Sequence, residues 1–174
     1  MSDAVERWVA SIESLSSDLI GWLEKAYPEE GCGLVVSRDG DIEFWRCDNV
    51  INRYHEADPE TYPRDASDFY MIDPRRFMEA EAGDNQLAVI VHSHPDAGDY
   101  FSEADVESAL MPSEEGEPRE AIYPDVCYLV VSVVEGRAQR ASLFKFEAGG
   151  EEASFPRVAR WEVTEEQRLR AVDI

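Results

Sequence analysis

The sequence predicts an α+β fold, an α/β sandwich in which helices flank a mixed β-sheet. Three observations predict this class: apolar residues recur with a helical period over residues 12–27, strand-like runs alternate with turn signals, and residues 87–91 form an unbroken apolar run typical of a buried strand. With 174 residues, of which 44% are hydrophobic, the chain is long enough for one domain with a sizeable core. We place that core at about residues 10–148 of the domain 1–174, and treat 149–174 as a C-terminal extension.

The opening helix is marked by one apolar stripe over residues 12–27. Ser11 or Ser14 is a suitable N-cap, and Tyr27-Pro28 ends the helix because the residue before a proline disfavours the α region. The stripe consists of Ile12, Leu15, Leu19, Trp22, Leu23 and Ala26.

A hairpin is expected next, with strands at residues 32–37 and 42–50 joined by the turn signal Asp39-Gly40. Residues 52–67 are polar, contain two prolines and show no period, so they predict a loop that lies over a site or moves. A short strand is expected at residues 69–72.

A second helix is predicted from its start signal, with Asp73 as N-cap and Pro74 at the first helical position, and it runs to about Ala82. Glycine and asparagine then break the helix ahead of the central strand. Residues 111–124 are rich in Glu, Pro and Ser and predict a second exposed loop.

The last paired strands are expected at residues 126–134 and 141–146, joined across residues 135–137 as a final hairpin. In the C-terminal extension, Trp161 and Val163 are the apolar residues expected to dock on the surface of the domain.

The net charge of −22, from 38 acidic and 16 basic residues, argues against nucleic acid and anionic membranes as partners and favours basic or neutral ones. An equally good explanation of the charge is solubility, for instance in a salt-rich cytoplasm. No apolar run approaches the roughly 20 residues of a membrane span, and the acidic start of the chain is unlike a signal peptide.

The cysteines are Cys32, Cys47 and Cys127, an odd number without CxxC spacing. Free, buried thiols in a reducing compartment account for them most simply, which predicts a cytoplasmic protein. Cys32 is therefore expected to be a small core residue rather than a nucleophile.

A metal site is predicted where the central strand ends. His92 and His94 stand two residues apart, so their side chains share one face of the strand. Ser102 is an expected N-cap of a helix to about Leu110, and Asp105 lies in its first turn. Two imidazoles and one carboxylate suit Zn²⁺ and leave a fourth position for water.

Other interpretations of these residues stay open at this point. The two histidines are alternatively structural, and Asp105 alone would be a first-turn acid favoured by the helix dipole. Asp96 and Asp99 lie in the connecting loop and compete as ligands, although Asp99 would crowd the open position.

The spacing resembles a known family. His92-x-His94-Pro95, six residues, Ser102, two residues and Asp105, together with the upstream Glu30-Gly31-Cys32-Gly33, is similar to the signature of the JAMM/MPN+ zinc metalloproteases, which include the prokaryotic JAB proteins. The resemblance implies a partly curled mixed sheet of cytidine-deaminase-like architecture, with the first and last helices on opposite sides.

The same resemblance implies roles for two more residues. Glu30, rather than its neighbour Glu29, would be the general base that takes a proton from water. Ser102 would help to stabilise the oxyanion of the reaction. The remaining histidine, His55, is expected to be a solvated loop residue.

By this resemblance the substrate would be a ubiquitin-like or sulfur-carrier protein, cleaved after its C-terminal Gly-Gly tail at a peptide or isopeptide bond. One alternative is a phage tail-assembly peptidase of the same family, although a cell-wall peptidase domain normally follows there and none is expected here. Another is a metal-free MPN scaffold, which usually lacks the ligands. The sequence leaves the oligomeric state open.

Overall fold

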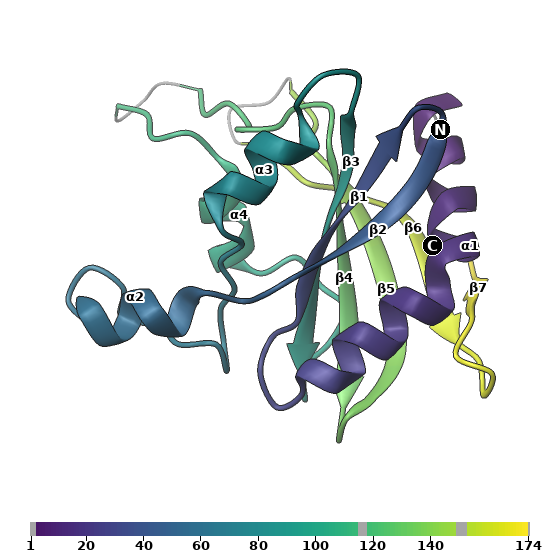
Figure 1. The fold of residues 1–174 in the computed structure, drawn as a ribbon, viewed down its shortest axis with the longest axis horizontal. Coiled ribbons are helices and arrows are strands. Elements are labelled where there is room, and N and C mark those ends of the chain that lie inside the picture. The colour runs from purple at the N-terminus through teal and green to yellow at the C-terminus, as the bar shows by residue number, and fades with distance from the viewer. Residues whose placement is uncertain (1–2, 115–117, 149–152, 174) are drawn as a thin grey trace.

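A seven-stranded sheet forms the centre of the protein, with helices on both of its faces (Figure 1). The computed structural model describes residues 3–114, 118–148 and 153–173. The strand order is β2-β1-β3-β4-β5-β6-β7; β3 and β4 are parallel, and the other neighbours are antiparallel. The strands are β1 (Cys32–Arg38), β2 (Asp41–Cys47), β3 (Gln86–Pro95), β4 (Cys127–Val134), β5 (Arg137–Lys145), β6 (Arg157–Val163) and β7 (Leu169–Ala171).

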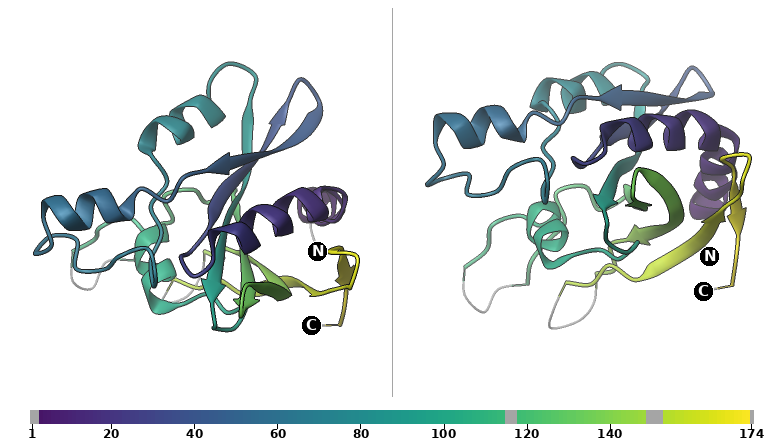
Figure 2. Two further views of the ribbon diagram at one scale, coloured as in Figure 1. Left: turned by 60° about the horizontal axis from the view of Figure 1, so that its bottom comes forward. Right: turned by 90° about the horizontal axis from the view of Figure 1, so that it is seen from below.

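The helices are α1 (Asp3–Ala26), α2 (Ile51–Ala57), α3 (Pro74–Ala80) and α4 (Glu103–Ala109). The first covers one face of the sheet, and α3 and α4 lie on the other, while the sheet twists and curls along its width (Figure 2). The α+β class and the placement of the first and last helices on opposite sides are therefore confirmed. Among the described residues, no helix combines the length and apolar character needed to cross a membrane.

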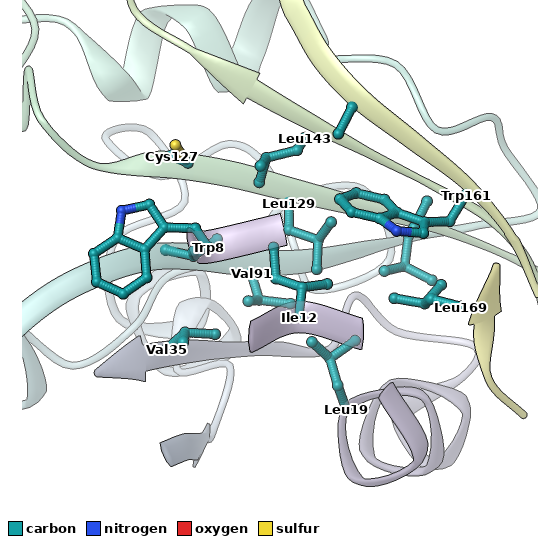
Figure 3. Close-up of a cluster of buried hydrophobic side chains, with 14 of the residues drawn as sticks. Trp8, Ile12, Leu19, Val35, Val91, Cys127, Leu129, Leu143, Trp161 and Leu169 are labelled. Carbon is teal, nitrogen blue, oxygen red and sulfur yellow. The ribbon is translucent and has the colours of Figure 1, made fainter. Parts of the chain in front are cut away.

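Helix α1 begins well before the predicted residue, because Val5 and Trp8 continue its apolar stripe and are buried. The prediction of Ser11 or Ser14 as N-cap is wrong, since both lie inside the helix. Their hydroxyls donate to backbone carbonyls of the preceding turn, those of Arg7 at 2.9 Å and of Ser11 at 2.7 Å. The stripe packs on a cluster of aliphatic side chains from the sheet (Figure 3).

The β1–β2 hairpin forms through the predicted turn, in which Asp39 and Gly40 have φ of 51° and 90°. Strand β2 ends three residues earlier than expected. Gly33 on β1 packs closely against β2: a Cβ there would lie 2.5 Å from the ring of Phe44, so only glycine fits.

Residues 52–67 are not a loop throughout, because α2 occupies the first part. Only one of its residues, Ile51, is buried, so no apolar period marked the helix. The predicted strand at 69–72 is also wrong: Ile72 makes a single bridge to Asn49. The Asn49 amide donates instead to the carbonyls of Glu30 and Phe69, at 3.0 and 2.9 Å.

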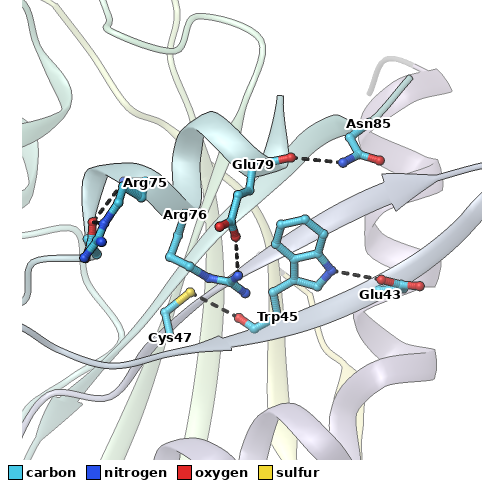
Figure 4. Close-up of polar contacts among 8 residues, drawn as sticks. Glu43, Trp45, Cys47, Arg75, Arg76, Glu79 and Asn85 are labelled. Carbon is cyan, nitrogen blue, oxygen red and sulfur yellow. Dashed lines mark hydrogen bonds and ion pairs between the residues drawn. The ribbon is translucent and has the colours of Figure 1, made fainter. Parts of the chain in front are cut away.

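Helix α3 begins as predicted, with the Asp73 carboxylate accepting from the Arg75 N–H at 3.0 Å. It is held against the edge strand β2 by Arg76, whose guanidinium lies 4.9 Å from the centre of the Trp45 ring and pairs with Glu79 (Figure 4).

The predicted hairpin of β4 and β5 is confirmed, with a turn at Glu135 and Gly136 and a longer second strand than expected. It is not the last one. The extension adds β6 and β7 to the sheet, and Trp161 is fully buried in the core beneath α1. The prediction that Trp161 and Val163 dock on the surface is therefore wrong for Trp161, while Val163 packs at the edge of that core.

Candidate metal centre

Strand β3 carries both histidines to one point on the face opposite α1. Val89 and Val91 belong to the core under α1, whereas Ile90 belongs to the other core, so from Ile90 onward the even-numbered side chains face α3 and α4. His92 and His94 follow this alternation. Their rings are 4.9 Å apart, their Nε2 atoms are separated by 3.1 Å, and both are buried.

The first turn of α4 supplies the carboxylate. The Ser102 hydroxyl accepts from the Asp105 N–H at 3.1 Å, and the Asp105 carboxylate accepts from the Ser102 N–H at 2.8 Å. This reciprocal capping box fixes the helix start and the direction of the Asp105 side chain. The predicted N-cap is confirmed, and the same contact aims the carboxylate at β3.

Asp105 meets the two histidines at short range. Its Oδ1 lies 3.2 Å from His92 Nε2, and its Oδ2 lies 3.4 Å from His94 Nε2. Donor atoms around a tetrahedral zinc ion, each about 2.0–2.1 Å from it, are roughly 3.3 Å apart. The three side chains therefore fit a common ion, and the structure brings these three candidate ligands together, while their role as ligands stays a prediction.

The two alternative ligands lie elsewhere. The Asp99 carboxylate accepts from the Ser142 hydroxyl at 2.6 Å and pairs with Arg160. Asp96 accepts from the Tyr27 hydroxyl at 2.9 Å. Among the described residues, neither belongs to a group that could hold a metal.

Neighbours orient the two rings. The Nδ1 of His94 donates to the Gly98 carbonyl at 3.0 Å, so in the neutral ring Nε2 carries no proton and can bind a metal. The His92 ring stacks on Tyr70 with 4.4 Å between ring centres. Within the described part of the chain, its Nδ1 has no hydrogen-bond partner. Tyr70 and Gly98 were missed by sequence reasoning, because neither contact follows from a local pattern.

The electrostatics suit a metal. Burial lowers the pKa of His92, which favours the neutral imidazole that a metal requires. Burial opposes ionisation of Asp105, but the charges and hydrogen bonds of His92, His94 and Ser102 outweigh it and lower the pKa of this carboxyl. Burial also lowers the pKa of His94, but Asp105, Glu30 and the Gly98 carbonyl outweigh it, so that pKa is raised and a metal would displace a proton there.

Glu30 and Glu29 are clearly distinguished. Glu30 is buried at 6% exposure, and burial raises its pKa to about 8, while His94 acts in the opposite direction and Asp105 adds to the rise. Glu29 is exposed, and its carboxylate accepts from the Asn52 amide at 3.0 Å. Of the two glutamates, Glu30 is therefore the one that interacts electrostatically with His94 and Asp105. Its role as base stays a prediction.

Ser93 holds the Glu30 segment against β3. Its hydroxyl accepts from the Gly31 N–H, and its own N–H donates to the Gly31 carbonyl, both at 2.9 Å. Because Glu30 precedes Gly31, these bonds fix the base segment beside the two histidines. The position of Ser93 between two predicted ligands is the signal in the sequence that points to this role.

Two other residues have structural surroundings. Cys32 is fully buried with its Sγ 3.6 Å from the Cys47 carbonyl, and burial raises the pKa of its thiol well above the usual value. This agrees with a core residue, and all three cysteines are free and buried. His55 is not a solvated loop residue: it lies in α2, is half-buried, and its Nδ1 is 2.7 Å from the Tyr62 carbonyl.

The curled mixed sheet and the buried His-His-Asp group together define a domain of the JAB/MPN class with a candidate metal centre. Residues 13–144 match the family described as prokaryotic homologs of the JAB domain, and the chain belongs to that family.

Comparison with solved structures finds a protein from Salinibacter ruber (strain DSM 13855), with 20% identity, a TM-score of 0.47, and coverage of 92% of this chain and 86% of that one. A protein from Desulfitobacterium hafniense has 16% identity, a TM-score of 0.47, and coverage of 92% and 87%. No curated protein matches the sequence.

Proposed function

We propose that the protein is a zinc-dependent metallopeptidase or isopeptidase that hydrolyses the bond after the C-terminal Gly-Gly tail of a ubiquitin-like or sulfur-carrier protein. The observation that carries the proposal is the meeting of His92, His94 and Asp105 at one point, with the buried carboxyl of Glu30 within electrostatic range. Family membership supports the same activity.

Zinc bound by the three ligands would polarise the substrate carbonyl and lower the pKa of a water molecule to about 7. Glu30 then takes the proton from water and passes it to the leaving amine. The raised pKa of Glu30 belongs to the metal-free group, and a cation nearby favours the carboxylate form that a base needs.

Ser102 has two proposed tasks. Its hydroxyl donates to the Asp105 carboxylate at 2.7 Å, which supports the ligand. We propose that the same hydroxyl turns toward the developing oxyanion during the reaction, a contact that elsewhere is worth about 2.7–4 kcal/mol.

The proposed substrate enters as an extended tail along a strand edge. Glycines at its end allow the backbone to approach the metal without a side-chain clash. We place the protein in the cytoplasm, which the free cysteines support. Nucleic acid and membranes are not among the proposed partners, in keeping with the net charge of −22.

The test is incubation of the zinc-loaded protein with ubiquitin-like proteins that carry C-terminal extensions, followed by intact mass measurement. We expect a product ending in Gly-Gly. Substrates whose second glycine is replaced by leucine should resist cleavage, because leucine blocks the close approach. Cleavage elsewhere would refute the assigned specificity, and zinc binding without any cleavage would refute the proposed activity on these substrates.

A further inference from the structure

The orientation of the candidate ligand His94 depends on a short loop. The residues before and after Gly98 in this loop are both held by hydrogen bonds to the sheet. Residues 96–101 connect β3 to α4, and the Gly98 carbonyl in this loop accepts the hydrogen bond from His94 Nδ1 at 3.0 Å. That bond fixes which nitrogen of the ring faces Asp105. The position of the Gly98 carbonyl therefore decides whether His94 is ready to bind a metal.

The residue before Gly98 is anchored to β4. The Ala97 carbonyl accepts from the Ser132 hydroxyl, and Ser132 lies beside His94 in the parallel register of β3 and β4. The residue after Gly98 is anchored more strongly. The Asp99 carboxylate is only 5% exposed and accepts from the Ser142 hydroxyl at 2.6 Å.

The same carboxylate forms an ion pair with an arginine of the C-terminal extension. Arg160 on β6 approaches both oxygens of Asp99, with Nε at 3.2 Å and Nη2 at 3.4 Å. Arg160 is the direct cross-strand partner of Ser142, so the two donors meet Asp99 from neighbouring strands. A two-point contact of this kind fixes direction as well as position.

Arg160 lies outside residues 13–144, the part that matches the family. Arg160 contacts none of the three candidate ligands, so it has no direct role in binding a metal. It contacts the buried carboxylate of Asp99, next to Gly98, and through it can affect His94 indirectly. A carboxylate as buried as Asp99 would leave its place if the guanidinium were removed, because an unpaired buried charge is costly.

We propose that Arg160 is a positioning residue for the metal site, which holds the Gly98 carbonyl against His94 through Asp99. The C-terminal extension thereby completes the metal centre as well as the sheet. The inference rests on the proposed metal site and is independent of the substrate.

The first experiment measures the His94 ring in the metal-free protein by NMR correlation of imidazole protons with ring nitrogens. At a pH where the ring is neutral, His94 of the wild type should be protonated at Nδ1 as a single tautomer. Arg160→Met should produce a mixture of tautomers, and Arg160→Lys should restore part of the wild-type signal. An unchanged His94 signal in a folded Arg160→Met protein would overturn the proposal, whether or not zinc binds.

The second experiment measures zinc affinity by competition with a chelating dye. Arg160→Met should weaken binding by about 10–100-fold, the range found for residues that support metal-ligating histidines. The matched control is Arg170→Met on β7, whose side chain is 69% exposed and pairs with Glu162, and which should bind zinc normally. Equal affinity of both variants would also overturn the proposal.

A further variant separates positioning from stability. If Arg160→Met does not fold, Ser142→Ala removes the other donor to Asp99 without leaving a charge unpaired, and it should shift the same His94 signal more weakly. Wild-type protein that binds no zinc would instead refute the proposed function, while the NMR measurement still tests the role of Arg160.

Discussion

The two faces of the sheet are covered differently, and the difference separates stability from chemistry. On one face a single helix of 24 residues, α1, lies on a continuous, mainly aliphatic core that also includes Trp161. On the other face two helices of seven residues, α3 and α4, cover a smaller core with many aromatic rings. The buried polar residues His92 and Asp105 lie on this second side.

The second face also carries the candidate metal centre. The capping box of α4 directs the Asp105 carboxylate toward the histidines of β3. We therefore expect substitutions on the metal face to remove metal or rate, and substitutions under α1 to remove stability.

The largest effect is expected from His92→Ala. If the proposed zinc site is correct, the wild type should bind one ion per chain and the variant should lose it, because two ligands are too few to hold zinc tightly. Metal content after dialysis against a weak chelator measures this. His55→Ala, which changes the histidine of α2, should keep full metal content; a zinc-loaded His92→Ala protein would show that the site lies elsewhere.

Next in size is Glu30→Gln. The variant should keep zinc and fold while kcat falls by about 10²–10⁴-fold, because only proton transfer is removed. Hydrolysis of one fusion substrate, followed over time, gives the rate. Glu29→Gln is the matched control, since Glu29 is exposed. Loss of activity in the control alone would mean that the base is assigned to the wrong glutamate.

Trp161→Ala tests the opposite face. The side chain is fully buried, and its indole N–H donates to the Glu13 carboxylate at 2.9 Å. We expect a fall of about 3–5 kcal/mol in the free energy of unfolding, measured with urea.

The folded fraction of Trp161→Ala should bind zinc with unchanged affinity, since Trp161 belongs to the core under α1. Trp45→Ala on the edge strand should cost less stability, because this side chain is only half-buried. A large loss of zinc affinity in Trp161→Ala would contradict the view that the core under α1 affects stability but not metal binding.

The smallest effect concerns the net negative charge of the protein. If the net charge of −22 attracts basic tails, KM for a fusion substrate should rise by roughly tenfold or less between low and physiological salt, with kcat changed much less. Steady-state kinetics at several salt concentrations measure both constants. A KM that does not depend on salt would mean that the charge serves solubility alone.

Local patterns were sufficient for several parts of the fold. The alternation along β3 correctly placed His92 and His94 on one face, and the capping signals correctly began α3 and α4. Such features depend on residues within a few positions of one another, so the sequence expresses them directly. Helix α2 was missed because a helix with one buried residue has no period to detect.

The sequence by itself determined the central strand, the helix caps and the spacing of the candidate ligands. Only the tertiary structure decided that the extension joins the sheet, that Trp161 is buried, and that Arg160 reaches Asp99 across 61 positions of the chain. The physical reason is that a strand's partner and the burial of its face depend on which sheet edge is free. A free edge arises only after distant segments have paired.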